Sequence, residues 1–484
     1  MSDDEEGGAG ASEILDESPF RWKKLFADVT EIDRQPHMYY GGWYWIRQPD
    51  GNYGCNYVMV LDDGRCFIGV EDIMGRAGVS FRRLPEVKPE PRWHAPFVKD
   101  FVRGDSSNPD EDNVYDLCLN AFRSYIDYEE PGAAMLMALY TIQTYLMPIF
   151  DTTAYILITG PKRSGKSKNF DVAEQLVFNP VRAVNMSVSS IFRIIEDWQA
   201  TLLIDESDLD LPEKAAGIRT ILLSGYKRGL FVLRTEKTTK DRHFVERYDV
   251  FGPKMIVAPQ GVAETMREQM LLDRCIPITM QRTTDELLTK RSVRPSDPFW
   301  ADIRHHLYCF ALKHWREVAD NLLEMPDKLP LMSREYEKWS PLFAVAEYFG
   351  LFDELFSFCR EKVSEVFLEE ESESSEVKLL RFLIHLFRSA EAGGEALVKE
   401  SVMDGLEGYY VSSSELVMRL EQHYGKESWI NPRSIGRILT SVFALNRKPL
   451  KIVRSGKPYY FLEKRKLERL AEKYGINFEN PLEV

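Results

Sequence analysis

The sequence predicts an α/β protein with a parallel-sheet core domain, preceded by a small β-rich domain and followed by helical segments. Short apolar runs alternate with helical patterns from 154 to 280, which is typical of a parallel sheet with right-handed crossovers. The first apolar run leads directly into a glycine-rich loop. The flanking regions lack this alternation. We therefore expect six segments: an acidic tail at 1–18, a β-rich domain at 19–97, a helical pair at 98–150, the core at 151–290, a helical segment at 291–378 and a C-terminal domain at 379–484.

The N-terminal region is predicted to form a small antiparallel sheet. Residues 1–18 are acidic and rich in Gly and Ser, which is typical of a disordered tail and not of a secretory signal. From 39 to 83, β-rich runs are separated by the turns PDGN and DDG, which predict a meander. The proline-rich run 84–96 is predicted to be a linker, and helices are expected near 114–128 and 132–147. The aromatic residues of the meander either stack on nucleic acid bases or, as is more common, pack within the sheet: Tyr39, Tyr40, Trp43, Tyr44 and Trp45.

The core begins with a predicted buried strand, Ala154–Thr159, followed by the sequence GPKRSGKS. This sequence is an intact G-x-x-x-x-G-K-S phosphate-binding loop. Its glycines let backbone N–H groups point at phosphate oxygens, and the helix at 166–178 directs its positive end at the same anion. We therefore expect ATP and Mg²⁺ as cofactors, with Lys166 on the β and γ phosphates and Ser167 on the metal. The nucleotide-binding residues are those of the loop: Gly160, Pro161, Lys162, Arg163, Ser164, Gly165, Lys166 and Ser167.

Four more strands complete the predicted sheet, and one of them ends in two carboxylates. A parallel sheet places the carboxyl ends of its strands at one edge, where ligands bind. Asp205 and Glu206 follow an apolar run and should therefore lie near the phosphate loop. Asp205 would belong to the Mg²⁺ shell, and Glu206 would polarise the attacking water. The strands are expected at 181–186, 201–208, 253–258 and 274–280, with a helix at 189–199.

The C-terminal region has the helix–helix–hairpin order of a winged helix. Helices are expected at 412–424 and 431–443, the second capped by Asn431 with Pro432 at its first position. Residues 431–470 hold eleven Lys or Arg and two Glu, so this block is basic within a chain of net charge −14. A local basic block indicates nucleic acid binding; a winged helix used for protein contacts is the alternative. The candidate contacts are Arg433 and Arg437 in a groove, and Arg454 and Lys457 on phosphates.

Composition narrows the class of protein further. At 484 residues with 44% hydrophobic content, two to four domains and a large core are expected. The six cysteines include no C-x-x-C pair, which argues against a zinc site and a disulfide framework and fits a reducing cytoplasm. The acidic balance restricts any DNA contact to local sites. The apolar stretch 133–150 contains Gln143 and Thr144, which favours a core helix over a membrane span.

Residues 114–465 resemble AAA+ ATPases, in particular the helicase-like ATPases encoded with phage and plasmid primases. The sequences that carry this resemblance are, in chain order, GPKRSGKS, FRIIEDWQATLLIDESD, SGYKRG, YDVFGPKMIVAP, DRCIPITMQR and REYEKWSPLFAVAEYFG. GPKRSGKS is shared by many ATPases, whereas FGPKMIVA with DRCIPITMQR is more specific. The first 100 residues carry no part of the resemblance, and no primase motif is present. The resemblance implies an AAA+ P-loop core, a helical lid at 291–378, a C-terminal winged helix and assembly into a hexameric ring.

The resemblance also implies roles for individual residues. Arg274 matches an arginine finger that reaches the γ-phosphate of a neighbouring subunit, with Arg267 and Arg282 as alternatives; a structural ion pair is the other interpretation. Arg334 matches a second sensor on the lid. A polar sensor is expected after the fourth strand, and Gln260 is the residue that could serve there.

Two β-rich arms within residues 230–250 predict a hairpin. Related hexameric helicases place such a hairpin in the central pore, where basic residues contact the DNA backbone. A solvated loop is the alternative interpretation. The candidates for DNA contact are Lys237, Lys240 and Arg242.

These features predict a ring-forming, ATP-hydrolysing DNA helicase or translocase of a mobile element or viral replication system. DNA is the expected partner, together with a primase or polymerase. Two other functions stay open: a DNA-bound ATPase switch that does not unwind, such as a loader, recombination or defence regulator, and an ATPase that does not act on DNA. DNA-stimulated ATPase activity distinguishes the last function from the first two, and strand displacement distinguishes the first two from each other.

Overall fold

The computed structural model describes residues 21–481, with gaps at 49, 82–83, 86–87, 105–112, 183–185, 206–211, 238–242, 259–272, 374, 394–397, 402–406, 427–428, 446, 449–458, 475 and 480. The chain divides into two compact units, residues 1–362 and 363–484. Among the described residues, no helix combines the length and apolar character needed to cross a membrane.

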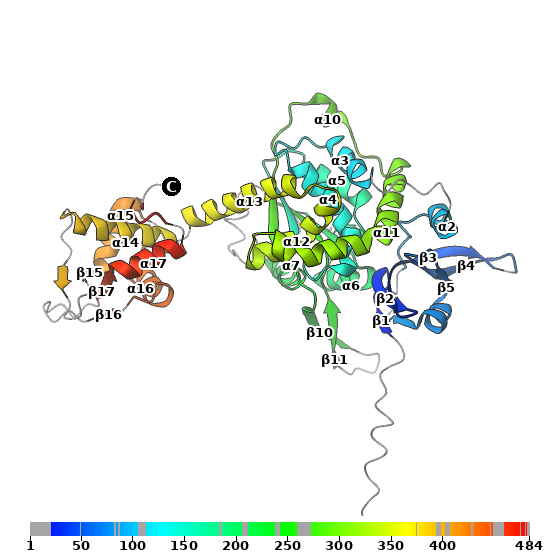
Figure 1. The fold of residues 1–484 in the computed structure, drawn as a ribbon, viewed down its shortest axis with the longest axis horizontal. Coiled ribbons are helices and arrows are strands. Elements are labelled where there is room, and N and C mark those ends of the chain that lie inside the picture. The colour runs from blue at the N-terminus through cyan, green and yellow to red at the C-terminus, as the bar shows by residue number, and fades with distance from the viewer. Residues whose placement is uncertain are drawn as a thin grey trace, which may run out of the picture. The chain divides into compact units, whose positions relative to one another are not determined.

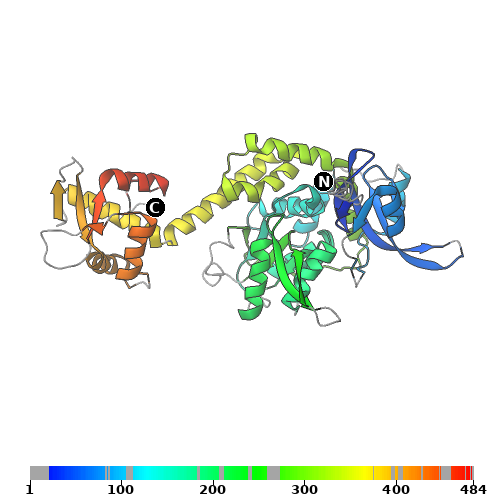
Figure 2. The same cartoon turned by 90° about the horizontal axis from the view of Figure 1, so that it is seen from below.

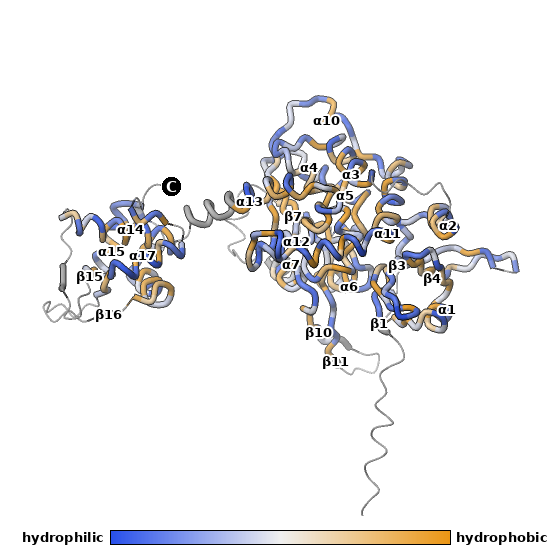
Figure 3. Tube along the Cα trace, viewed as in Figure 1, coloured by the Kyte–Doolittle hydropathy of each residue, from blue (hydrophilic) through white to orange (hydrophobic). Residues whose placement is uncertain are grey.

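The first unit is built on a five-stranded parallel sheet, as the alternating pattern predicts. Its strand order is β13-β7-β12-β9-β8. Every residue of β9 and β12 is buried, as expected for strands covered on both faces, and apolar segments gather around β7 in Figure 3. The strands are β7 (Tyr155–Thr159), β8 (Pro180–Arg182), β9 (Thr201–Ile204), β12 (Lys254–Val257) and β13 (Cys275–Thr279).

Helices surround this sheet (Figure 1). All thirteen residues of α4 are buried, which confirms a core helix within the apolar stretch 133–150. The predicted helical segment at 291–378 contains α11 to α13. The elements are α3 (Val114–Arg123), α4 (Ala133–Tyr145), η3 (Met147–Ile149), α5 (Lys166–Leu176), α6 (Val188–Trp198), α7 (Pro212–Ser224), α10 (Glu286–Lys290), α11 (Phe299–Lys328), α12 (Ser333–Tyr348) and α13 (Phe352–Glu373).

The N-terminal part of this unit contains the predicted meander, extended by one strand. The antiparallel order is β2-β3-β4-β5, and β1 pairs in parallel with β6. Neither β1 nor β2 was predicted. Tyr39, Tyr40 and Trp43 are buried, which confirms packing for these three aromatics, whereas Trp45 is exposed. The elements are β1 (Arg21–Lys23), β2 (Ala27–Ile32), β3 (Gln35–Arg47), β4 (Tyr53–Leu61), β5 (Cys66–Ile68), α1 (Val70–Asp72), η1 (Ile73–Ala77), β6 (Val79–Phe81) and α2 (Ala95–Arg103).

The second half of the predicted linker is instead part of the core. Trp93 is buried and stacks on Tyr308 of α11 at 4.9 Å. Tyr40 of the meander meets the same Tyr308 ring edge-on at 4.8 Å and donates a hydrogen bond to the Tyr145 carbonyl at 2.6 Å. Aromatic contacts of this kind add to the energy of apolar burial. The β-rich region, the segment after it and α11 therefore share one aromatic cluster.

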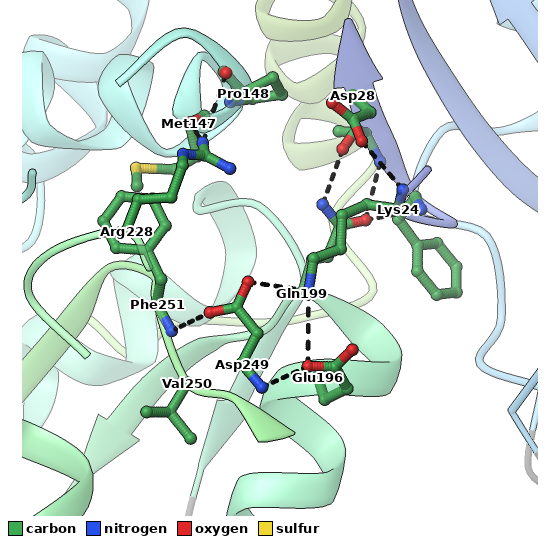
Figure 4. A network of polar contacts seen from close by, with 12 residues as sticks. Lys24, Asp28, Met147, Pro148, Glu196, Gln199, Arg228, Asp249, Val250 and Phe251 are labelled. Carbon is green, nitrogen blue, oxygen red and sulfur yellow. Dashed lines mark hydrogen bonds and ion pairs between the residues drawn. The ribbon is translucent and has the colours of Figure 1, made fainter. Parts of the chain in front are cut away.

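A polar network joins the meander to the sheet on another side (Figure 4). Gln199 ends α6 with left-handed backbone angles, φ 50° and ψ 46°. Its amide accepts from the backbone N–H groups of Phe26 and Ala27 at 2.7 and 2.9 Å and donates to the Ala27 carbonyl at 2.7 Å. Lys24 forms ion pairs with Asp249 at 3.0 Å and Glu196 at 3.5 Å. The N-terminal strands are thereby attached to α6 and to the end of β11.

The predicted hairpin is present as the antiparallel pair β10 (Phe231–Lys237) and β11 (His243–Asp249), which projects from the core (Figures 1 and 2). Its two ends are held by Lys254, the first residue of β12, whose side chain is fully buried. The ammonium donates to the carbonyls of Val250, Gly252 and Gly225 at 2.9, 2.8 and 3.2 Å. A Cβ on Gly225 would lie 2.5 Å from this nitrogen, so only glycine fits there. One cation therefore ties both ends of the hairpin to the sheet.

The second unit has a core of its own and a four-stranded antiparallel sheet of order β14-β15-β17-β16. Both predicted helices are present, and the Asn431 carboxamide accepts from the Ser434 N–H at 2.9 Å, which confirms the predicted cap. The predicted pair of C-terminal strands is also present. The elements are α14 (Ser375–Glu391), β14 (Val398–Ser401), β15 (Glu407–Ser412), α15 (Ser413–Tyr424), α16 (Pro432–Arg437), η5 (Ile438–Val442), β16 (Arg447–Lys448), β17 (Tyr459–Glu463) and α17 (Lys464–Lys473).

Lys254→Met tests the role of the buried ammonium. The change keeps the apolar stem but removes three donors from buried carbonyls, and each unsatisfied group costs about 1–3 kcal/mol. We expect the free energy of unfolding, measured by chemical denaturation, to fall by about 3 kcal/mol or more. Lys227→Met, at an exposed lysine paired with Glu337, is the control and should cost less than about 1 kcal/mol.

The same pair of proteins should differ in pH dependence. Burial lowers the pKa of Lys254 to about 7, whereas an unfolded chain has a lysine pKa near 10.4. Between these values the unfolded state holds the extra proton, so the wild-type stability rises with pH through this group. The stability difference between wild type and Lys254→Met should therefore widen from about pH 7 to pH 9.5. A difference that stays constant over this range would contradict the shifted titration.

Candidate functional site

The phosphate loop follows β7 and ends at the first turn of α5. Gly160, Arg163 and Gly165 have φ values of 148°, 66° and 86°, which coil the backbone between strand and helix. A Cβ on Gly160 would lie 2.3 Å from the Met280 carbonyl oxygen, so this position requires glycine for space as well as for conformation. α5 begins at Lys166, as predicted. The loop thus has the conformation that presents the amino end of a helix to an anion.

Two side chains of the loop are suited to bind phosphate oxygens. The Lys166 ammonium lies over the loop and donates to the carbonyls of Gly160 and Pro161 at 2.5 and 3.0 Å. The Ser164 hydroxyl is buried and, within the described part of the chain, makes no hydrogen bond. A buried donor of this kind is costly unless a ligand satisfies it. Ser167 is exposed at the start of α5, where its hydroxyl is accessible to a metal ion.

Asp205 lies at the carboxyl end of β9, on the same edge of the sheet. Because β12 separates β9 from β7, the two strand ends are about 10 Å apart at the usual interstrand spacing. Asp205 pairs with Arg182 of β8 at 3.4 Å, and the same guanidinium pairs with Asp171 of α5 at 3.0 Å. The sequence analysis did not identify Arg182, although it lies in a predicted strand. Glu206 and the predicted sensor Gln260 lie outside the described residues.

A cavity of about 220 Å³ adjoins the phosphate loop. Its walls are the segment 125–127, the loop itself and the segment 280–289. The walls are linked by a 2.6 Å hydrogen bond from Thr283 to Asp127 and by Lys168, which donates to the Leu288 carbonyl at 2.6 Å. Burial and the nearby Arg291 lower the pKa of Lys168, and Asp171 opposes this shift. Apolar walls beside a phosphate loop suit a nucleotide base. The sequence analysis missed this cavity because its walls are distant in the chain.

Arg274 and Arg334 come together away from the phosphate loop. Arg274 precedes β13, so it lies at the amino end of the sheet, about 16 Å from the carboxyl edge at the usual rise per residue. Its guanidinium is buried over the Tyr226 ring at 4.4 Å, and that of Arg334 lies 5.8 Å from the same ring and pairs with Asp273 at 2.9 Å. The structure thus groups the two predicted arginines but does not bring Arg334 to its own phosphate loop.

The alternatives to Arg274 differ in what the structure says of them. Arg282 donates from its Nε to the Lys162 carbonyl at 3.1 Å, so it contacts the phosphate loop of its own subunit. Arg267 lies outside the described residues.

The predicted DNA-binding residues lie in two places. Lys237 ends β10, while Lys240 and Arg242 are outside the described residues. In the second unit, Arg433 and Arg437 are exposed one turn apart on α16, and the side chains of Ile435 and Ile438 face the core. Arg454 and Lys457 fall between β16 and β17, outside the described residues.

No protein-family model and no curated protein matches this chain. Solved structures similar to it include three described as follows. An active helicase, Cch of SCCmec type IV, is 12% identical, with a TM-score of 0.38 over 96% of this chain and 100% of that one. The C-terminal region of NrS-1 is 11% identical, with a TM-score of 0.35 over 90% and 96%. A full-length MCM homologue from Methanopyrus kandleri is 12% identical, with a TM-score of 0.31 over 68% and 72%.

Thr289→Trp tests whether the cavity holds the base. Thr289 is an exposed residue of the cavity wall, so a larger side chain there fills the space without disturbing the core. We expect ATP to bind at least about tenfold more weakly, while inorganic triphosphate, which has no base, binds as to wild type. Thr284→Trp, an exposed neighbour outside the cavity, should leave both affinities unchanged. Equal weakening for ATP and triphosphate would place the base elsewhere.

Proposed function

We propose that this chain hydrolyses ATP and uses the energy to move on DNA, as a ring-forming helicase or translocase. The observation that carries the proposal is the phosphate loop at the start of α5. Its Lys166 ammonium and buried Ser164 hydroxyl lie at the same sheet edge as the Asp205 carboxylate. A cation, an unsatisfied donor and an acid at this spacing suit a nucleoside triphosphate with its metal.

Each group has a distinct role in the proposed reaction. Lys166 and the amino end of α5 stabilise negative charge on the β and γ phosphates. Ser167 and Asp205 would hold Mg²⁺, which neutralises phosphate charge when it is bound. Arg182 fixes the Asp205 carboxylate from the side of β8. Glu206, the next residue, would orient and deprotonate the attacking water.

The position of Arg274 supports a shared active site. A guanidinium about 16 Å from its own phosphate loop can serve only the nucleotide of another subunit. β13 is an edge strand, so this side of the sheet is suited to face a neighbour. Arg274 must leave the Tyr226 ring to reach a phosphate, and Arg334 on the same ring is a second cation that could accompany it.

Two features support DNA as the partner. The β10–β11 hairpin projects from the core with Lys237 at the end of β10 (Figure 2). In the second unit, the helix–helix–hairpin order with exposed Arg433 and Arg437 supports a winged helix that reads or grips DNA.

Lys166→Ala and Glu206→Gln separate binding from chemistry. Lys166→Ala removes the charge that holds the phosphates, so we expect loss of both ATP binding and turnover. Glu206→Gln removes only the base, so ATP should still bind while hydrolysis falls to background. Binding of a fluorescent ATP analogue and phosphate release measure the two properties. Wild-type turnover in Lys166→Ala would refute the site, and normal hydrolysis in Glu206→Gln would refute the base.

The wild-type protein then decides among the functions. ATPase activity stimulated by DNA, with displacement of a labelled strand, is the expected result. Stimulation without displacement would indicate the DNA-bound switch, and no stimulation would indicate an ATPase that acts on another partner.

Mixed rings test the trans role of Arg274. We expect Arg274→Ala protomers to bind ATP normally and to hydrolyse it more slowly by about 10³-fold, as for other arginine fingers. Mixing them with Lys166→Ala protomers should restore part of the activity, because some interfaces then combine an intact Lys166 with an intact Arg274. An inactive mixture with demonstrated subunit exchange, or full activity of Arg274→Ala alone, would contradict the assignment.

A further inference from the structure

The β3–β4 hairpin extends beyond the rest of the N-terminal region (Figures 1 and 2), and one of its faces carries mostly aromatic side chains. Residues at alternate positions of two paired strands project to the same face. The register of β3 and β4 therefore defines one surface, here named the aromatic face: Trp43, Trp45, Arg47, Tyr53, Cys55 and Tyr57.

The aromatic face changes from buried to exposed toward the tip of the hairpin. At its base, Trp43 and Tyr57 are buried and meet edge-on at 5.4 Å. Nearer the tip, Trp45 is 72% exposed and Tyr53 is 66% exposed. In the described part of the chain, these are the two Phe, Tyr or Trp side chains with more than a third of their surface exposed. They lie on adjacent strands at diagonal positions, about 7–8 Å apart. Two such rings side by side on a projecting hairpin contribute nothing to the core.

The charge on this face is positive. Arg47 is exposed opposite Tyr53, and the Lys88 ammonium lies 4.2 Å from the centre of the Trp43 ring. The single acid in the sequence from 43 to 57 is Asp50 of the turn, whose carboxylate accepts from the N–H and the side-chain amide of Asn52, both at 3.0 Å. The face therefore offers cations beside free aromatic rings.

We propose that the aromatic face is a second nucleic acid site, which binds single-stranded DNA by stacking bases on Trp45 and Tyr53. Stacking platforms combined with cations that track the backbone are the common means of holding single strands without sequence preference. Arg47 and Lys88 supply those cations. A protein-binding patch would be expected to add aliphatic side chains, and the aromatic face has none. The inference rests on DNA being the substrate proposed above, and it places a contact in the region that the sequence resemblance does not cover.

The test compares two double variants of the full-length chain. Trp45→Ala with Tyr53→Ala removes both rings, and Trp45→Phe with Tyr53→Phe keeps them. Fluorescence anisotropy with a labelled oligo(dT) measures the affinity, since each stacked base typically contributes about tenfold or more. We expect the alanine pair to bind at least about tenfold more weakly and the phenylalanine pair to bind nearly as wild type. Basal ATPase without DNA should be unchanged in both. Leu323→Ala with Met332→Ala, two exposed apolar residues outside the hairpin, is the matched control and should bind as wild type.

The outcomes separate this inference from the proposed function. If the alanine pair binds oligo(dT) as wild type while wild type still displaces strands, the aromatic face is not a DNA site and the helicase proposal stands. If the phenylalanine pair is as weak as the alanine pair, stacking is refuted. If the alanine pair changes the oligomeric mass but not the DNA affinity, the face joins copies of the chain, which also overturns the proposal. If wild type fails to bind oligo(dT) at all, both proposals fall.

Discussion

The buried ammonium of Lys254 is the constraint on which the arrangement of the first unit depends. β12 lies between the strand that precedes the phosphate loop and the strand that ends in Asp205. Its first residue uses all three ammonium donors on carbonyls at the two ends of the β10–β11 hairpin. A cation without water is tolerated only when its donors are satisfied, so the carbonyls and the ammonium fix one another. The position of the hairpin is consequently set by the same sheet that forms the nucleotide site.

A second set of polar contacts fixes the hairpin from the opposite side. Asp249 ends β11, binds Lys24 of the N-terminal region and accepts from the Phe251 N–H at 3.0 Å. Gln199 acts as a substitute for a backbone peptide, because its side-chain amide both accepts from and donates to β2 and the residue before it (Figure 4). The N-terminal region is therefore built into the ATPase unit rather than tethered to it. A DNA contact on the β3–β4 hairpin would be connected to the sheet through these bonds and through the aromatic cluster around Tyr308.

The sequence was sufficient for features that depend on neighbours in the chain. Apolar runs located all five strands of the central sheet, the loop motif located the start of α5, and Asn431 with Pro432 located the start of α16. Features that depend on distant segments could not be predicted. The pairing of Arg182 with Asp205, the cavity between 125–127 and 280–289, and the burial of Trp93 within a proline-rich run all arise when separate segments meet. The same limit applies to Arg334, whose partner Asp273 is 61 residues away.

The region around Tyr226 connects these elements at the amino end of the sheet. Tyr226 follows Gly225, whose carbonyl binds Lys254, and its own carbonyl accepts from the Thr153 N–H at 2.9 Å, two residues before β7. Its ring carries Arg274 and lies near Arg334. If Arg274 serves the nucleotide of a neighbouring subunit, it must leave this ring, and the nearest groups free to respond are the ends of the hairpin. Nucleotide turnover in one subunit and hairpin position in the next would then be coupled through a path of two residues, Tyr226 and Gly225, with no domain movement required.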